Sequence, residues 1–170
     1  MSAWLQTKSW EEAKEAIVKS KGVAIVPIGS VEQHSYHLPL GTDTYVAMTI
    51  AEEAAEKTGA VLTPPVWFGW SPHHMVLPGT VTIRPEVLSE LTYDIIESLN
   101  AHGLNKIILI NGHRIVNVVW MQICAQRAQS KLGCIGSDVF VVRICGIKIS
   151  FCLSNERTSK GGKGLSRFSK

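Results

Sequence analysis

Side chains that commonly bind metal ions gather in two short polar segments of this chain. Glu32, His34 and Asp43 fall within the segment 29–43, and His113 follows a later apolar run. Carboxylate and imidazole groups together are typical ligands of zinc, manganese and similar divalent ions. The residue types and their spacing therefore indicate a candidate site for a divalent metal.

Each of these residues also has an ordinary structural interpretation. Asp43 stands where it could cap the N-terminus of a helix, and His34 could be a histidine of a surface loop. Glu32 and His113 have similarly plain alternatives. The metal site is favoured because all four residues fall at turns between a strand and a helix.

The elements that must position these residues alternate between strands and helices. Ser9 and Glu12 have the spacing of a capping box, which predicts the start of the first helix. Short apolar runs predict strands, and longer segments between turn residues predict helices: strands at 23–28, 61–63, 80–83, 106–110 and 139–142; helices at 10–19, 43–57, 85–101 and 117–131.

This alternation predicts an α/β fold with a mainly parallel central sheet and helices on both faces. In such sheets the ligand lies beyond the carboxyl ends of the strands, where the strand order reverses. The segments 29–43 and 111–117 each follow a buried strand. We therefore expect them to meet at one edge of the sheet.

The segment 29–43 reads GSVEQHSYHLPLGTD, which resembles the creatininase-family signature of the form G-S-x-E-Q-H-x-x-H-L-P-L-x-T-D. His113 stands in NGHRIVN, similar to the second motif of that family, N-G-H-x-x-N or its variants. The segment 77–80, LPGT, resembles the F-P-G-T segment of the family. The matches run in the correct order from residue 23 to about residue 142, so the expected fold is creatininase-like.

The resemblance implies a centre with two divalent ions, zinc or manganese. Asp43 would bridge them, Glu32 and His113 would complete one site, and His34 would join the other. A water activated by the metals would attack the carbonyl of a small, cyclic amide, as in creatinine amidohydrolases. No residue is assigned as the catalytic acid or base.

One family ligand is missing from the sequence. In family members a further Glu binds the second metal, either two residues after the second-motif His or in a downstream H-A-G-E segment. Here Ile115 holds the first position, and no H-A-G-E follows residue 142. The missing Glu leaves open a truncated, catalytically impaired metal-binding member. A family hydrolase acting on a ring ketone such as a keto-inositol is a second alternative, because Arg114 and the Trp67–His74 loop depart from the creatinine hydrolase pattern.

Candidate substrate-binding residues lie in the aromatic loop 66–79 and beside the second motif. The loop could close over a substrate, although simple loop packing is an equal alternative. Arg114 could meet an anionic or carbonyl-rich substrate, or be an exposed charge. The loop residues concerned are Trp67, Trp70, His73 and His74.

Charge divides the chain near residue 142. Residues 1–142 carry 10 basic and 13 acidic residues, whereas 143–170 carry seven basic residues and one acid. We expect a metal-binding domain over 1–142 and a divergent basic tail over 143–170, either a disordered tail of a natural short variant or the product of a shifted reading frame. The tail lacks the regular basic face with interleaved aromatics that is typical of a nucleic-acid arm.

The remaining features indicate a cytoplasmic enzyme with a small-molecule substrate. No apolar run reaches the roughly 18 residues that a membrane span needs, and the N-terminus lacks the apolar core of a secretory signal. Cys124 lies in an apolar helical pattern and is expected in the core. The family resemblance adds the expectation of a homo-oligomer.

Overall fold

The computed structural model describes residues 2–113, 116–132, 138–145 and 148–152. Five strands form one sheet in the order β2-β1-β3-β4-β5. Strands β1 (Val23–Ile28), β2 (Val61–Leu62), β3 (Lys106–Asn111) and β4 (Asp138–Cys145) pair in parallel. Strand β5 (Lys148–Cys152) pairs antiparallel with β4. The predicted mainly parallel sheet is therefore confirmed.

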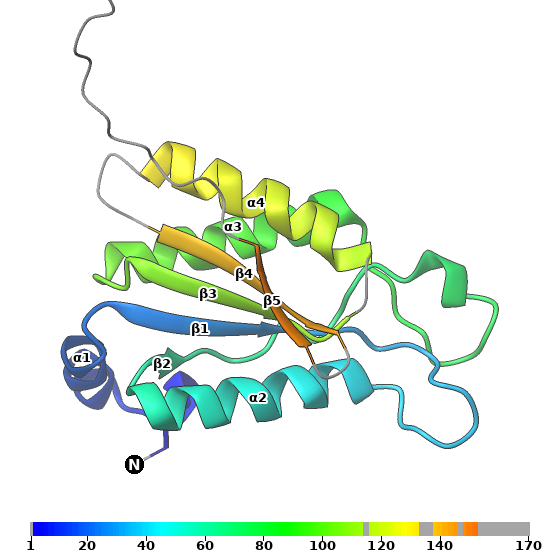
Figure 1. The fold of residues 1–170 in the computed structure, drawn as a ribbon, viewed down its shortest axis with the longest axis horizontal. Helices are drawn as coiled ribbons and strands as arrows, with labels where there is room; N and C mark the ends of the chain where they lie inside the picture. Colours follow the sequence, from blue (N-terminus) through cyan, green and yellow to red (C-terminus); the bar gives the residue numbers. More distant parts are fainter. Residues whose placement is uncertain (1, 114–115, 133–137, 146–147, 153–170) are drawn as a thin grey trace, which may run out of the picture.

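Helices cover both faces of this sheet (Figure 1). Helix α2 (Thr42–Thr58) lies on one face, and helices α3 (Pro85–Ala101) and α4 (Val116–Leu132) lie on the other. Helix α1 (Trp10–Lys19) precedes β1 and begins with the predicted capping box, in which Ser9 and Glu12 exchange hydrogen bonds.

Alternating side chains of β1 supply two hydrophobic cores, as expected for a strand buried on both faces. Val26 and Ile28 belong to the core under α3 and α4, together with Cys124, which is fully buried as predicted. Ile25 packs on the opposite face with Ala47 and other small residues of α2. Small side chains let α2 lie close to the sheet, and this closeness sets the position of Asp43, the predicted metal ligand in its first turn.

The structure differs from the predicted elements in two segments. Residues 80–83 form single bridges, Val81 with Val31 and Thr82 with Gly69, and not a strand. Strand β4 continues to Cys145 and is followed by β5, which the sequence pattern did not predict. The tail was expected to be disordered over 143–170, but its residues up to Cys145 and Lys148–Cys152 lie in β4 and β5, because they pair with each other at the edge of the sheet. Residues 146–147 and 153–170 of the expected tail lie outside the described part of the chain.

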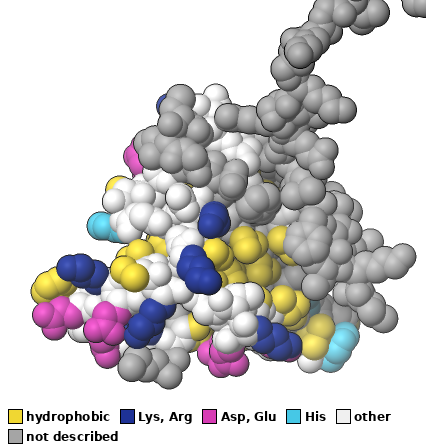
Figure 2. Space-filling view, turned by 60° about the vertical axis from the view of Figure 1, so that its left-hand side comes forward, with side chains coloured by type: hydrophobic (Ala, Val, Ile, Leu, Met, Phe, Trp, Pro, Cys, Tyr) yellow, Lys and Arg dark blue, Asp and Glu magenta, His cyan; other side chains and the backbone are white. Residues whose placement is uncertain are grey.

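The loops beside the carboxyl ends of the strands expose several large hydrophobic side chains. They include Tyr36 and Leu38 in one loop, and Met75, Val76 and Leu77 in another. Figure 2 shows that hydrophobic side chains also gather on the face displayed there, with Lys and Arg side chains beside them. Among the helices of the described residues, none combines the length and the hydropathy that a membrane crossing requires.

Candidate metal centre

The strand order reverses between β1 and β3, and the loops that follow these two strands bring the predicted ligands together. The first loop folds back on itself, because the Glu32 N–H donates to the Leu40 carbonyl over 3.0 Å. This turn carries Glu32 into the interior, where its side chain is 7% exposed. The loop then enters α2, with Asp43 in its first turn.

Asp43 does not cap this helix. Gly41 holds the cap position, and no side chain accepts a capping hydrogen bond there. The Asp43 carboxylate lies instead against two imidazole rings. Its Oδ1 is 3.0 Å from His34 Nε2, and its Oδ2 is 2.7 Å from His113 Nδ1. The capping alternative is therefore excluded by the structure.

His113 is held in place through its own backbone at the end of β3. The Asn111 side chain makes two hydrogen bonds to the His113 backbone: its Nδ2 donates to the His113 carbonyl, and its Oδ1 accepts from the His113 N–H. The ring is 3% exposed, and its Nδ1 also lies 3.4 Å from Glu32 Oε1. The two carboxylates thus share one nitrogen of one buried imidazole.

The donor set fits a divalent cation. One ligand atom from each of Glu32, Asp43 and His113 lies within 4.8 Å of the others. Zinc prefers three or four ligands of these types, at about 2.0–2.2 Å from the ion. His34 Nδ1 lies 3.0 Å from the Glu32 carbonyl, to which it can donate, so that its Nε2 is free to act as a fourth donor beside Asp43.

The charged groups of the site shift one another's pKa. Burial alone would raise the pKa of Glu32, but the interaction with His113, the nearby Ser71 hydroxyl and the charge of the neighbouring imidazoles outweigh it and hold that pKa at about 2. Burial would likewise lower the pKa of His113, yet Asp43 and Glu32 raise it to about 9. Two carboxylate side chains beside one imidazole are the kind of group that attracts a cation.

The aromatic loop contributes one imidazole to this site. His74 Nε2 lies 3.6 Å from Glu32 Oε1, and its Nδ1 is 2.8 Å from the Gln33 amide nitrogen. His73 is exposed and its ring contacts that of His74, with centroids 4.1 Å apart and the planes tilted by 48°. The structure therefore places His74, but not His73, beside a proposed ligand.

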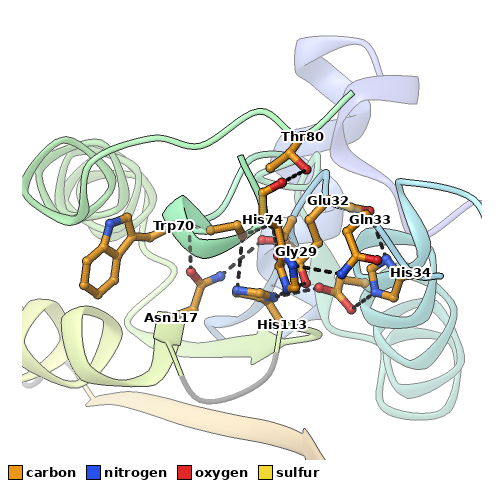
Figure 3. A network of polar contacts seen from close by, with 12 residues as sticks. Gly29, Glu32, Gln33, His34, Trp70, His74, Thr80, His113 and Asn117 are labelled. Atoms are coloured by element: carbon orange, nitrogen blue, oxygen red, sulfur yellow. Dashed lines mark hydrogen bonds and ion pairs between the residues drawn. The ribbon is translucent and has the colours of Figure 1, made fainter. Parts of the chain in front are cut away.

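The side chains of the two tryptophans of this loop pack against residues other than Glu32 and His74. The Trp67 ring packs edge-on against Tyr45, with centroids 5.6 Å apart. The Trp70 ring packs against the core on the side of α3 and α4 and points away from Glu32 and His74 in Figure 3. Arg114, the other predicted substrate-binding residue, lies outside the described residues.

Several buried polar residues of the site were not predicted from the sequence. Ser30 and Ser71 are fully buried, and their hydroxyl oxygens lie 2.8 Å apart. Asn117 joins three elements: its Nδ2 donates to the Gly29 carbonyl, and its Oδ1 accepts from the Trp70 N–H and the Trp120 indole. Ser30 and Asn117 stand inside the two family-like motifs, which is the only signal the sequence offered for them.

Comparison with known proteins gives concordant results. The family model of creatinine amidohydrolase, Creatininase, matches residues 6–159. A 3-dehydro-scyllo-inosose hydrolase of Thermotoga maritima is 35% identical over 65% of this chain and 35% of its own length. The creatinine amidohydrolase of Pseudomonas putida is 26% identical over 66% of this chain and 45% of its own. A mycofactocin precursor peptide peptidase of Mycolicibacterium smegmatis is 39% identical over 54% and 39%.

Solved structures agree with these relatives. A type II creatininase mutant superposes with a TM-score of 0.77 at 25% identity, covering 84% of this chain and 58% of its own. Other creatininase structures that match are of a Zn-Zn type and an Mn form. The chain spans less than half the length of the curated relatives it matches. On the family match, the fold and the motif order together, the chain belongs to the creatininase family.

Proposed function

We propose that this chain carries the metal-binding part of a divalent-metal-dependent hydrolase that acts on a small, cyclic amide. The observation that carries this proposal is the meeting of Glu32, Asp43 and His113, whose ligand atoms lie within 4.8 Å of one another. These residues come from two loops at the point where the strand order reverses, the usual ligand position of an open α/β sheet.

The donor atoms that would hold the metal fall into two groups. Glu32, His113 and Asp43 Oδ2 form one group of donors, while Asp43 Oδ1 and His34 Nε2 form a second group beside it. A divalent ion held there, zinc or manganese, would supply Lewis-acid activation of water and of a carbonyl group. We further propose that His74, whose Nε2 lies 3.6 Å from Glu32 Oε1, donates a hydrogen bond to a substrate oxygen.

A second candidate substrate is a ring ketone such as a keto-inositol. The relative that favours it is the inosose hydrolase, which is 35% identical to this chain, compared with 26% for the creatinine amidohydrolase. Both substrates present a carbonyl carbon to the same donor groups, so the ligand set does not separate them. Residues outside the metal site must do so.

A third candidate is a metal-binding member with impaired catalysis. Ile115 stands where the family resemblance places a second-metal Glu, and an isoleucine side chain has no atom that binds a metal. In that case the donor group of Glu32, Asp43 and His113 would still bind one ion, but His34 and Asp43 Oδ1 would leave the second ion short of ligands.

Metal analysis combined with a hydrolysis panel tests these proposals. The protein is loaded with zinc or manganese, dialysed, and analysed for metal per chain, then assayed with creatinine, a lactone and a keto-inositol. Turnover of one substrate that a chelator abolishes and the metal restores supports the hydrolase. One ion per chain without turnover supports the impaired member. No retained metal contradicts all three candidates.

A further inference from the structure

Two buried serine hydroxyls connect the side chain of Glu32 to the ring of His113 on the side away from Asp43. Ser30 Oγ lies 3.3 Å from Glu32 Oε2. It also lies 2.8 Å from Ser71 Oγ, which in turn is 3.3 Å from His113 Nε2. All four side chains are buried, and water therefore does not compete for these contacts.

The direction of the hydrogen bonds along this chain of contacts follows from a count of protons. Three contacts require three protons, and the two serine hydroxyls supply two of them. The ionised carboxylate of Glu32 can only accept. All three contacts are hydrogen-bonded only when His113 Nε2 carries the third proton and donates it to Ser71 Oγ.

We propose that the Ser30–Ser71 pair positions His113 for metal binding by holding its proton on Nε2 and leaving Nδ1 as the ligand atom. The inference rests on the proposed function, because it concerns the same metal. Nδ1 is the nitrogen that faces Asp43 Oδ2 at 2.7 Å and Glu32 Oε1 at 3.4 Å. The same hydroxyl pair holds Glu32 Oε2, so that Oε1 faces the metal ligands.

The fold holds these two serines together across 41 residues of sequence. Gly69 lets the aromatic loop lie directly on the end of β1, because a methyl group added there would come within 2.8 Å of the Gly29 carbonyl oxygen and 3.0 Å of the Ser30 side chain. The Ser71 N–H donates to Thr82 Oγ1 over 2.8 Å, which fixes the serine itself. Ser30 and Ser71 are therefore positioning residues that act through His113 and Glu32.

The ring of His113 in the zinc-loaded wild-type protein gives the direct test. Long-range proton–nitrogen spectra of protein labelled with ¹⁵N in histidine distinguish the protonated ring nitrogen, and the His113→Gln variant assigns the signal. We expect a proton on Nε2 with zinc on Nδ1. Zinc on Nε2, or an Nε2 without a proton, would overturn the inference, and this measurement does not depend on whether any serine variant folds.

Serine variants give the energetic test. Loss of a group that orients a metal ligand typically weakens metal binding 10- to 100-fold. We expect Ser71→Ala and Ser30→Ala each to weaken zinc binding by about that factor in calorimetric titration. The double variant should bind zinc no more weakly than the single variant that has the lower affinity. Zinc affinity unchanged in Ser71→Ala, or losses that multiply in the double variant, would contradict a single connected pair.

Thr92→Val is the matched control. Thr92 is also a buried hydroxyl residue, but its oxygen has no hydrogen-bond partner among the described residues, and it lies in α3. Its replacement should leave zinc affinity unchanged. If the wild-type protein binds no zinc, the proposed function fails, yet an Nε2 proton of His113 that exchanges more slowly than in Ser71→Ala would still support the positioning role. Equal exchange in the two proteins would overturn it.

Discussion

Asp43 is the residue shared by the two donor groups of the site, because its two oxygens face His34 and His113 separately. Asp43→Ala should therefore remove a ligand from both groups and abolish stable zinc binding, which elemental analysis after dialysis measures. Asp94→Ala, which removes an exposed carboxylate from α3, is the control and should retain the metal. Unchanged metal per chain in the Asp43 variant would refute the assignment.

The ring of His74 lies beside Glu32, and it is only partly buried. If it binds the substrate, His74→Ala should lower kcat/KM about 10-fold, since a hydrogen bond to a polar substrate contributes roughly 1.4 kcal/mol. The melting temperature should change little, because the ring is accessible to solvent. His73→Ala, the exposed neighbour, should leave kcat/KM unaltered, whereas parallel losses of stability and activity in the His74 variant would assign the loop to packing.

Helix α2 and the loop after β3 approach so closely at the site that only glycine fits between them. A methyl group added at Gly112 would overlap the carbonyl oxygen of Asp43. Gly112→Ala should therefore move the first turn of α2 and weaken zinc binding at least 10-fold, as measured by titration.

Gly59→Ala is the control for this substitution. Gly59 ends α2 with a φ of +74° and has open space around its Cα. Alanine there should cost about 1 kcal/mol of stability, measured by urea unfolding, and leave zinc affinity intact. Equal effects of both variants on metal binding would show that the tight contact at Gly112 has no special role.

Elements with a local signal were predictable from the sequence, and their ends agree with the structure to within about two residues. The capping box before α1, Pro85 at the start of α3 and the apolar run of β1 are signals of this kind. Strand β5 was missed because its pairing depends on the edge of β4, and 80–83 was overpredicted because its partners are single residues of distant loops.

The meeting of the proposed metal ligands was predictable for a related reason. Three of them stand in one contiguous motif, and the fourth follows a strand that a parallel sheet must place nearby. The contacts of Ser30 with Ser71 and of Glu32 with His74 were not predictable. Each joins residues about 40 positions apart, and their meeting depends on the path of the aromatic loop over the end of β1.

The described helices cover the two faces of the sheet unequally. Two helices, α3 and α4, pack on one face of the sheet, and only α2 packs on the other (Figure 1). The chain also spans less than half the length of its curated relatives. Hydrophobic side chains gather on the face shown in Figure 2. Contiguous apolar surface is typical of interaction sites, and the homo-oligomer stays a prediction.

A ligand that binds only the folded protein stabilises it by mass action. Zinc at 100 times its dissociation constant should therefore raise the free energy of unfolding by about 2.7 kcal/mol, visible as a concentration-dependent rise in melting temperature. Asp43→Ala should show no rise. A rise of equal size in that variant would mean that zinc stabilises the fold at another position.

The separation of the proposed ligands along the chain should also affect the kinetics of folding. Asp43 and His113 are 70 residues apart, and they meet only after β1 and β3 have paired in parallel and α2 has docked. Such non-local contacts form slowly. If they form after the transition state, zinc should slow unfolding in stopped-flow urea jumps and leave the refolding rate unchanged, while faster refolding would indicate that the ligands meet early. The ion would then lengthen the lifetime of the folded protein without taking part in its formation.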